Sequence, residues 1–530
     1  WSSDVCSSDL GPSSAVLPTH TGRIVKTAFF KHSVIAAVCA SLALTPAAGA
    51  FAAGQPLPDL NLPSLGTVAG ADLSLADERA LGETLMRQVR ADKTYLPDEE
   101  IADYLNRLGW RLVAAGRSQP FSFVFFPLRN ASLNAFAMPG GFVAVHTGLI
   151  VAAKNESELA GVIGHEVGHV TQRHIARMIA GGKDSLAITL GSILLALLAA
   201  KAGGSSGGDA AMAIALGTQG ALIQNQLKFS RDAEREADRI GFQSLVNAGF
   251  DPHGMENFFA RLQKSNRYYE NDATAFLSTH PLTNERLSDM ENRTKGIKRA
   301  VYPSSLDFYL IQARCRVLQE TGYDGWLKVS RYFRDALAKA KGKELAAAHY
   351  GLSIALSRMN KKAEALSEAR LAAQSVRDDS IILDKNLAEM SYALAKTASE
   401  KDAALKLSRK TYERYPDSAM AAQSYAELLW QAGKNTEVLK FLRNQTALSH
   451  EDPDYFAMLA RSYEATGQRS LAFAATGDMY ALMGNARAAV YQFDKAQQAN
   501  DGDFYTMSEI DAKLREQRRI VLDEEKDRQK

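Results

Sequence analysis

The stretch SELAGVIGHEVGHVTQRH, residues 157–174, places two histidines four positions apart, with a glutamate directly after the first. On an α-helix, residues i and i+4 lie on one face, one turn apart, so His165 and His169 can reach a single ion. Glu166 lies beside His165, where it can act as a general base without binding the ion. The pattern predicts a zinc site of the hydrolase type. Two histidines buried in an ordinary helical core are the alternative.

A catalytic zinc needs a third protein ligand and an open fourth position. The helical stretch SRDAEREADRIG, residues 230–241, offers Glu234 as that ligand. Asp238 follows one turn later on the same face, so we expect it to orient a ligand histidine. Glu236 points elsewhere on the helix, and we expect it in solvent. Simple pairing of these acids with neighbouring arginines is the alternative.

Other histidines are weaker candidates. His280 lies in STHPLTNERL, residues 278–287, where the spacing predicts a loop and then a helix start, so we expect a surface position. His174 is five residues after His169 on the same predicted helix and is not assigned to the metal. Cysteine ligands are excluded, because only Cys315 of the three cysteines lies outside the leader region.

The surrounding pattern predicts helices and two strands. We expect helices over 75–116, from Glu156 to about Ile179, over 228–248 and over 254–264, and strands over 121–127 and 141–146 with a turn at 138–141. We place the second strand at a sheet edge beside the site, where an extended peptide could pair with it. Its candidate substrate-binding residues are Phe142, Val143, Ala144 and Val145.

The first 74 residues are expected to form a leader, a signal peptide and an arm. Residues 1–22 lack a starting Met and a periodic pattern, which indicates a non-native leader. Residues 23–53 combine basic residues, an apolar run and small residues, and are typical of a secretory signal peptide. A membrane helix is the alternative, but the apolar run is short for one. Residues 54–74 indicate an extended arm.

The net charge and a second apolar segment indicate which classes of partner to expect. The 530-residue chain has a net charge of +2, so no bulk attraction to nucleic acid is expected. The apolar segment 185–227 predicts a core or interfacial hairpin, and a true membrane span is the alternative.

Beyond residue 302 the chain becomes continuously helical. Tyr425, Ala426, Leu429 and Gly433 recur 34 residues later as Leu459, Ala460, Tyr463 and Gly467. That period, with glycine at the turn, is the tetratricopeptide signature, and it predicts an array of helix pairs with a concave binding face. A generic helical bundle is the alternative.

Four motifs in this order carry a family resemblance: NAFAMPGGFVAVHTGL (134–149), GHEVGHVTQRH (164–174), SRDAEREADRIG and STHPLTNERL. With the repeats, they resemble the bacterial β-barrel assembly-enhancing proteases, whose peptidase family includes the CAAX prenyl endopeptidases and the HtpX heat-shock proteases. The resemblance implies a mainly α fold, with a gluzincin-type α+β metalloprotease domain (75–298) containing a small sheet, followed by an all-α tetratricopeptide array (302–525).

The same resemblance implies a zinc-dependent endopeptidase of the periplasm. It would use a metal-activated water to cut misfolded or incompletely assembled outer-membrane β-barrel proteins, and it would contact the barrel assembly machinery through its repeats. It implies one zinc ion per chain, held by His165, His169 and Glu234. Glu166, Asp238 and Arg286 would be the catalytic residues, with Glu166 as the base and Asp238 behind a ligand. We also expect that Arg286 or His280 can donate to the oxyanion once the loop closes. In such enzymes the residue matching His280 can close onto the zinc as a latch.

The resemblance also implies that 185–227 lies near the active site and contacts the membrane peripherally. Two other functions stay open. One is a repeat-based chaperone or scaffold with a latent or structural metal site, against which the retained Glu166 argues, because a structural ion needs no base. The other is an integral membrane quality-control protease.

Overall fold

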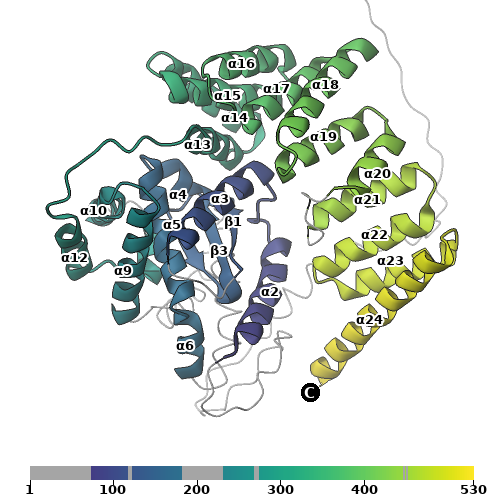
Figure 1. Cartoon of the computed structure of the whole chain (residues 1–530), viewed down its shortest axis with the longest axis horizontal. Coiled ribbons are helices and arrows are strands. Elements are labelled where there is room, and N and C mark those ends of the chain that lie inside the picture. Colours follow the sequence, from purple (N-terminus) through teal and green to yellow (C-terminus); the bar gives the residue numbers. More distant parts are fainter. Residues whose placement is uncertain are drawn as a thin grey trace, which may run out of the picture. The chain divides into compact units, whose positions relative to one another are not determined.

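The computed structural model describes residues 73–116, 122–181, 231–267, 274–445, 448 and 452–529. The predicted leader 1–22, signal peptide 23–53, most of the arm 54–74 and the insertion 185–227 lie outside these residues. Within them, the chain is mainly helical with one small sheet, as predicted (Figure 1). No helix in the described ranges is long and apolar enough to cross a bilayer.

Within the described residues, two capped helices precede the sheet, α2 (Leu75–Ala91) and α3 (Glu99–Ala115). The side chains of Ser74 and Asp98 begin them, because each accepts a hydrogen bond from a backbone N–H of the first turn. α3 buries a face that includes Tyr104, Leu105, Leu108 and Leu112 against the sheet and against helix α5. These helices confirm the helical pattern predicted over 75–116.

The sheet has three short strands, β1 (Val124–Leu128), β2 (Ala135–Ala137) and β3 (Phe142–His146). Their order is β1-β3-β2, with β1 parallel and β2 antiparallel to β3. A 3-10 turn, η1 (Pro139–Gly141), joins β2 to β3. β1 and β3 match the two predicted strands, whereas β2 was not predicted.

The prediction that Phe142, Val143, Ala144 and Val145 form a sheet edge is wrong. β3 is the central strand and bonds to a neighbour on each side, so its backbone has no side open to a peptide. All five residues of β3 are buried. The short strand β2 is an edge of the sheet instead.

In the part of the chain that the structure describes, seven further helices lie between β3 and the repeats. They are α4 (Thr147–Ala152), α5 (Glu156–Thr171), α6 (His174–Gly181), α9 (Arg231–Asn247), α10 (His253–Arg267), α11 (Thr274–Thr279) and α12 (Asn284–Thr294). The prediction of a single helix from Glu156 to Ile179 is wrong, because the helix is interrupted between α5 and α6. Arg173 there has a left-handed backbone, with φ at 52°, which an α-helix cannot continue.

The repeat region consists of twelve helices within the described residues. They are α13 (Leu306–Gln319), α14 (Gly322–Leu337), α15 (Gly342–Arg358), α16 (Lys362–Gln374), α17 (Ile381–Leu394), α18 (Ala398–Arg414), α19 (Ala419–Gln431), α20 (Asn435–Arg443), α21 (Pro453–Ala465), α22 (Arg469–Leu482), α23 (Ala486–Ala499) and α24 (Phe504–Gln529). Consecutive helices from α21 to α24 lie side by side (Figure 1).

The 34-residue period corresponds to equivalent turns. Gly433 follows α19 and Gly467 follows α21, and both have positive φ, at 71° and 79°. Glycine adopts this conformation without a steric penalty, so each turn can reverse the chain tightly into the next helix. The period therefore predicted the helix pairs correctly.

One of the hydrophobic clusters spans the first repeat helices and the region that precedes them. A continuous cluster of buried side chains runs from Ile101 in α3 through the sheet and α5 to Met420 in α19. The side-chain amide of Gln312 in α13 donates to three backbone carbonyls at the end of α4. The first repeat helices therefore pack directly on the protease region.

Candidate metal centre

Helix α5 carries the HExxH motif through the interior of the protein. Asn155 begins it by accepting a hydrogen bond from the N–H of Glu158. From Glu156 to Val170 every residue is buried. His165, Glu166 and His169 are all at most 1% exposed. Water therefore reaches these three side chains only if the segments that cover them move.

Glycines let α9 approach α5 closely enough to share a site. A Cβ on Gly241 would lie 2.7 Å from the backbone nitrogen of His165, and one on Gly168 would lie 2.8 Å from the carbonyl oxygen of Ala237. Any larger residue would separate the helices. This contact places Glu234 and Asp238, one turn apart on α9, against the histidines of α5.

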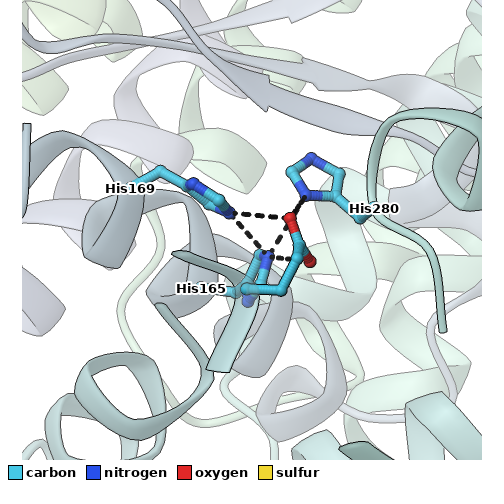
Figure 2. Close-up of side chains that lie close together, drawn as sticks. His165, His169 and His280 are labelled. Carbon is cyan, nitrogen blue, oxygen red and sulfur yellow. Dashed lines mark hydrogen bonds and ion pairs between the residues drawn. The ribbon is translucent and has the colours of Figure 1, made fainter. Parts of the chain in front are cut away.

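Three of the predicted site residues meet at one point. His165 Nε2 lies 3.0 Å from His169 Nε2 and 3.6 Å from Glu234 Oε2, and His169 Nε2 lies 3.4 Å from Glu234 Oε1. Figure 2 shows the imidazoles of His165 and His169 facing the same point. Burial lowers the pKa of His169 well below its ordinary value, so the ring is neutral and can offer a lone pair.

His280 joins them, so its predicted surface position is wrong. It follows α11, is 1% exposed, and turns its ring into the cluster (Figure 2). Its Nδ1 lies 3.0 Å from Glu234 Oε1 and 3.3 Å from His165 Nε2. The ring of Phe276 stacks on it at 4.8 Å between centroids. The geometry implied by the family resemblance, a histidine closing onto the metal ligands, is therefore present.

Glu166 faces the cluster from α5 and also touches the sheet. Its Oε2 accepts a hydrogen bond from the N–H of Ala137 in β2 at 3.0 Å, and its Oε1 lies 3.5 Å from His280 Nε2. Burial raises the pKa of Glu166, although the neighbouring histidines oppose the shift. A carboxylate with a raised pKa is a stronger base, which suits proton transfer.

Asp238 and Arg286 support the ligands from behind. Asp238 Oδ1 lies 2.8 Å from His165 Nδ1, as expected for a carboxylate that orients a ligand histidine. Arg286 contacts Asp238 through Nε and Nη2, at 2.6 and 2.8 Å, and Glu234 through Nη1, at 2.6 Å. Burial alone would raise the pKa of Asp238, but the charge of Arg286 and these hydrogen bonds lower it. The two carboxylates are thus held ionised.

The sequence did not indicate that His174 belongs to the site. Its Nδ1 lies 2.9 Å from Nδ1 of His169, and its Nε2 lies 3.1 Å from Oε2 of Glu236. The expectation that Glu236 is solvated is wrong in part: its side chain is 31% exposed and also pairs with Arg177 at 2.8 Å. The left-handed residue before His174 causes this contact, and no periodicity predicts it.

Residues 97–294 match peptidase family M48. Over 87% of its length the chain is 33% identical to the beta-barrel assembly-enhancing protease of Escherichia coli (strain K12), and the match covers 91% of that protein. The chain belongs to the family of beta-barrel assembly-enhancing proteases. The member from Yersinia pestis is 34% identical over 86% of this chain and 92% of its own. Family M48 consists of metallopeptidases, so this chain is a metalloendopeptidase.

More distant relatives match a smaller part of the chain. The mitochondrial metalloendopeptidase OMA1 of Schizosaccharomyces pombe is 29% identical over 42% of this chain and 62% of that protein. Among solved structures, a tetratricopeptide repeat protein from Parabacteroides merdae matches at a TM-score of 0.27 and 12% identity, over 49% of this chain and 98% of that one.

The side chains present fit the metal that this peptidase family implies. One atom each of His165, His169, Glu234 and His280 lies within 4.8 Å of the other three, and all four residues are buried. Ligands about 2.0–2.1 Å from a common ion, in a tetrahedral arrangement, lie about 3.3 Å from each other. The separations among His165, His169 and Glu234, at 3.0–3.6 Å, bracket that value, and the atom pairs that include His280 reach at most 4.8 Å. The donor atoms are therefore already arranged around one position.

Proposed function

We propose that the protein is a zinc-dependent endopeptidase that hydrolyses misfolded or incompletely assembled outer-membrane β-barrel proteins in the periplasm. The observation that carries the proposal is the buried convergence of His165, His169 and Glu234 beside Glu166. Nitrogen donors with one carboxylate in a tetrahedral arrangement favour zinc over magnesium or calcium, which prefer oxygen ligands. The similarity to the beta-barrel assembly-enhancing proteases of Escherichia coli and Yersinia pestis supports the substrate class.

Zinc, when bound by His165, His169 and Glu234, would supply Lewis acidity to the attacking water and to the scissile carbonyl. Glu166 takes the proton from the attacking water and passes it to the leaving amine nitrogen. Asp238 fixes the ring of His165 through Nδ1. Arg286 has its Nε, Nη1 and Nη2 engaged with Asp238 and Glu234, so we assign it to positioning these acids rather than to contacting substrate.

The substrate pairs with β2 in this proposal rather than with β3. Met138 donates to Phe142 and His146 donates to Asn134, so even-numbered residues of β2 direct their backbone groups toward β3. The backbone groups of Ala135 and Ala137 therefore point away from β3, and the N–H of Ala137 already reaches Glu166. An extended peptide added at this edge would pass beside the catalytic base, with little side-chain selection.

His280 is the proposed latch. Its Nδ1 lies 3.0 Å from Glu234 Oε1 and 3.3 Å from His165 Nε2, so with a metal held by His165, His169 and Glu234 this ring would occupy the position that the attacking water needs. Removal of this ring opens that position. The segment that carries it, α11 and the following loop, would have to withdraw for catalysis.

Three other segments of the chain bear on its location and its partners in this proposal. We assign export to the signal-peptide pattern at 23–53, contact with the assembly machinery to the repeat region, and peripheral membrane contact to 185–227. A scaffold with a structural ion and an integral membrane protease are the competing functions. Extraction of membranes with carbonate distinguishes the last of these, because only a membrane-spanning chain stays in the pellet.

The decisive experiment compares wild type, Glu166→Gln, His280→Ala and the double variant. We expect all four to bind one equivalent of zinc, His280→Ala to cleave an unfolded β-barrel protein faster than wild type, and Glu166→Gln to lose activity about 10²–10⁴-fold in either background. The exposed Glu285→Gln serves as a control. If His280→Ala is as inactive as the double variant while both retain zinc, the scaffold function is correct.

A further inference from the structure

The two ligand histidines on α5 have different neighbours behind them. His165 places its Nδ1 against a carboxylate, 2.8 Å from Asp238. His169 places its Nδ1 against another imidazole, that of His174, at 2.9 Å, with the ring centroids 4.9 Å apart. His174 is 4% exposed, so water does not compete strongly for this contact.

The helix break positions the second imidazole. In an uninterrupted helix, a residue five positions after His169 would point well away from it. The left-handed Arg173, with φ at 52°, redirects the chain so that His174 starts α6 with its ring beside His169. Glu78 of α2, itself 2% exposed, accepts a hydrogen bond from Arg173 Nε at 3.1 Å. A buried ion pair therefore supports the unusual conformation.

The hydrogen-bond chemistry leaves one arrangement of protons. His169 directs Nε2 toward the metal position, so that nitrogen keeps a lone pair and Nδ1 carries the hydrogen. His174 Nδ1 must then accept this hydrogen, which leaves the proton of His174 on Nε2. That N–H points at Glu236 Oε2, 3.1 Å away, and Glu236 also accepts from Arg177 at 2.8 Å.

We infer that His174 and Glu236 are positioning residues that act through His169. Together they form a relay from a half-exposed carboxylate, through a neutral imidazole, to the metal ligand, and this relay fixes the ring orientation and the proton position of His169. The inference rests on the proposed function, because it requires that His169 bind a metal ion. It adds a second carboxylate-supported ligand to the one that Asp238 provides.

The test measures zinc affinity directly. Zinc binding to wild type, His174→Leu, His174→Asn and Glu236→Gln is measured by competition with a chromophoric chelator, and the thermal midpoint of each metal-free protein checks folding. Leucine removes the acceptor, whereas the asparagine side chain can place an oxygen where His174 Nδ1 was. Glu236→Gln keeps an acceptor for the His174 N–H but removes the charge. Glu83→Gln, an exposed glutamate on α2, is the matched control.

We expect His174→Leu to weaken zinc binding about 10–100-fold, His174→Asn to recover most of that loss, and Glu236→Gln to fall between His174→Leu and wild type. The visible spectrum of bound Co²⁺ should change in His174→Leu and return toward wild type in His174→Asn, because it reports the ligand field.

Two results would overturn the inference while leaving the proposed function intact. The first is a His174→Leu protein that binds zinc as tightly as wild type. The second is equal weakening in His174→Leu and His174→Asn, which would mean that ring packing matters rather than the acceptor. Failure of wild type itself to bind stoichiometric zinc would overturn both proposals. If His174→Leu does not fold, the zinc affinities of Glu236→Gln and His174→Asn still test the inference. Wild-type zinc affinity in Glu236→Gln together with weak zinc binding in His174→Asn would contradict the relay.

Discussion

Arg286 is the residue whose contacts most constrain the metal centre. Its guanidinium binds Asp238 with two nitrogens and Glu234 with a third, and all three side chains are at most 3% exposed. Removing one partner from a buried ion pair leaves an uncompensated charge, which costs far more than losing an exposed pair. The stability of the site therefore depends on a residue that binds neither metal nor substrate in our proposal.

Arg286→Gln should lower the free energy of unfolding of the metal-free protein by about 3–5 kcal/mol, as measured by urea denaturation. Arg293→Gln, on the same helix, is the control. Its pair with Asp289 is 29% and 39% exposed, so its loss should cost no more than about 1 kcal/mol. Similar losses in the two variants would contradict the assignment.

Sequence spacing predicted residues that share a regular helix and missed those that do not. His165, Glu166 and His169 follow from the i, i+4 rule, and Glu234 and Asp238 follow from the same rule on α9. The position of His280 depends on how the segment after α11 folds back, and spacing carries no information about that. The place of His174 depends on one left-handed residue, which no apolar period reveals.

At the scale of elements, the spacing of α5 and α9 decides whether the ligands meet. Gly164, Gly168 and Gly241 line this contact, and a Cβ on any of them would come within 3.1 Å of the facing backbone. Backbone atoms cannot yield as a flexible side chain can. The separation of the two helices is therefore set by the absence of side chains.

Gly241→Ala should destabilise the protein by about 1–3 kcal/mol through overpacking and should weaken zinc binding, because it moves Glu234 away from the histidines. Gly325→Ala in α14 is the matched control. A Cβ there meets only the side chain and backbone of Glu320, at 3.1 Å and beyond, and alanine favours a helix by about 0.5–1 kcal/mol over glycine. We expect the thermal midpoint to fall in Gly241→Ala and to rise in Gly325→Ala. A Gly241→Ala protein with wild-type zinc affinity would contradict this account.

Elements with a clear period were predictable, and short ones were not. The helices α3, α5, α9 and α10 carry regular apolar faces, and the repeats carry a 34-residue period. The strand β2 has only three residues, too few for an alternating pattern to be recognised. Because β2 was missed, β3 was assigned to the edge that β2 occupies.

At the scale of the whole molecule, charged residues join the protease region to the repeats. Asp98 and Glu100, at the start of α3, pair with Arg314 of α13 and Lys385 of α17 at 2.7–3.1 Å. Beside them is a cavity of about 520 Å³. Glu99 also lines this cavity, where burial and then the charges of Asp452 and Asp454 raise its pKa from 4.5 to about 7.

This raised pKa predicts how stability changes with pH. The folded protein binds the Glu99 proton more tightly than the unfolded chain does, so ionisation of Glu99 reduces stability as pH rises from 4.5 toward 7. Glu99→Gln should therefore raise the thermal midpoint at pH 8 relative to wild type and change it much less at pH 4.5. The exposed Glu516→Gln should show no such difference between the two pH values, and equal behaviour of the two variants would contradict the prediction.

Dividing the chain between α12 and α13 would expose the cluster of buried apolar side chains that spans the protease region and the repeats. Glu156, the first residue of the zinc-site helix, accepts hydrogen bonds from the N–H and the hydroxyl of Ser305, just before the first repeat helix. An enzyme shortened to residues 75–298 would therefore leave apolar surface in water and lose the anchor of its own catalytic helix, so we expect it to aggregate. In the function proposed above, a partner that binds the first repeat helices would therefore contact elements that pack directly on the helix carrying Glu166, rather than a separately folded module.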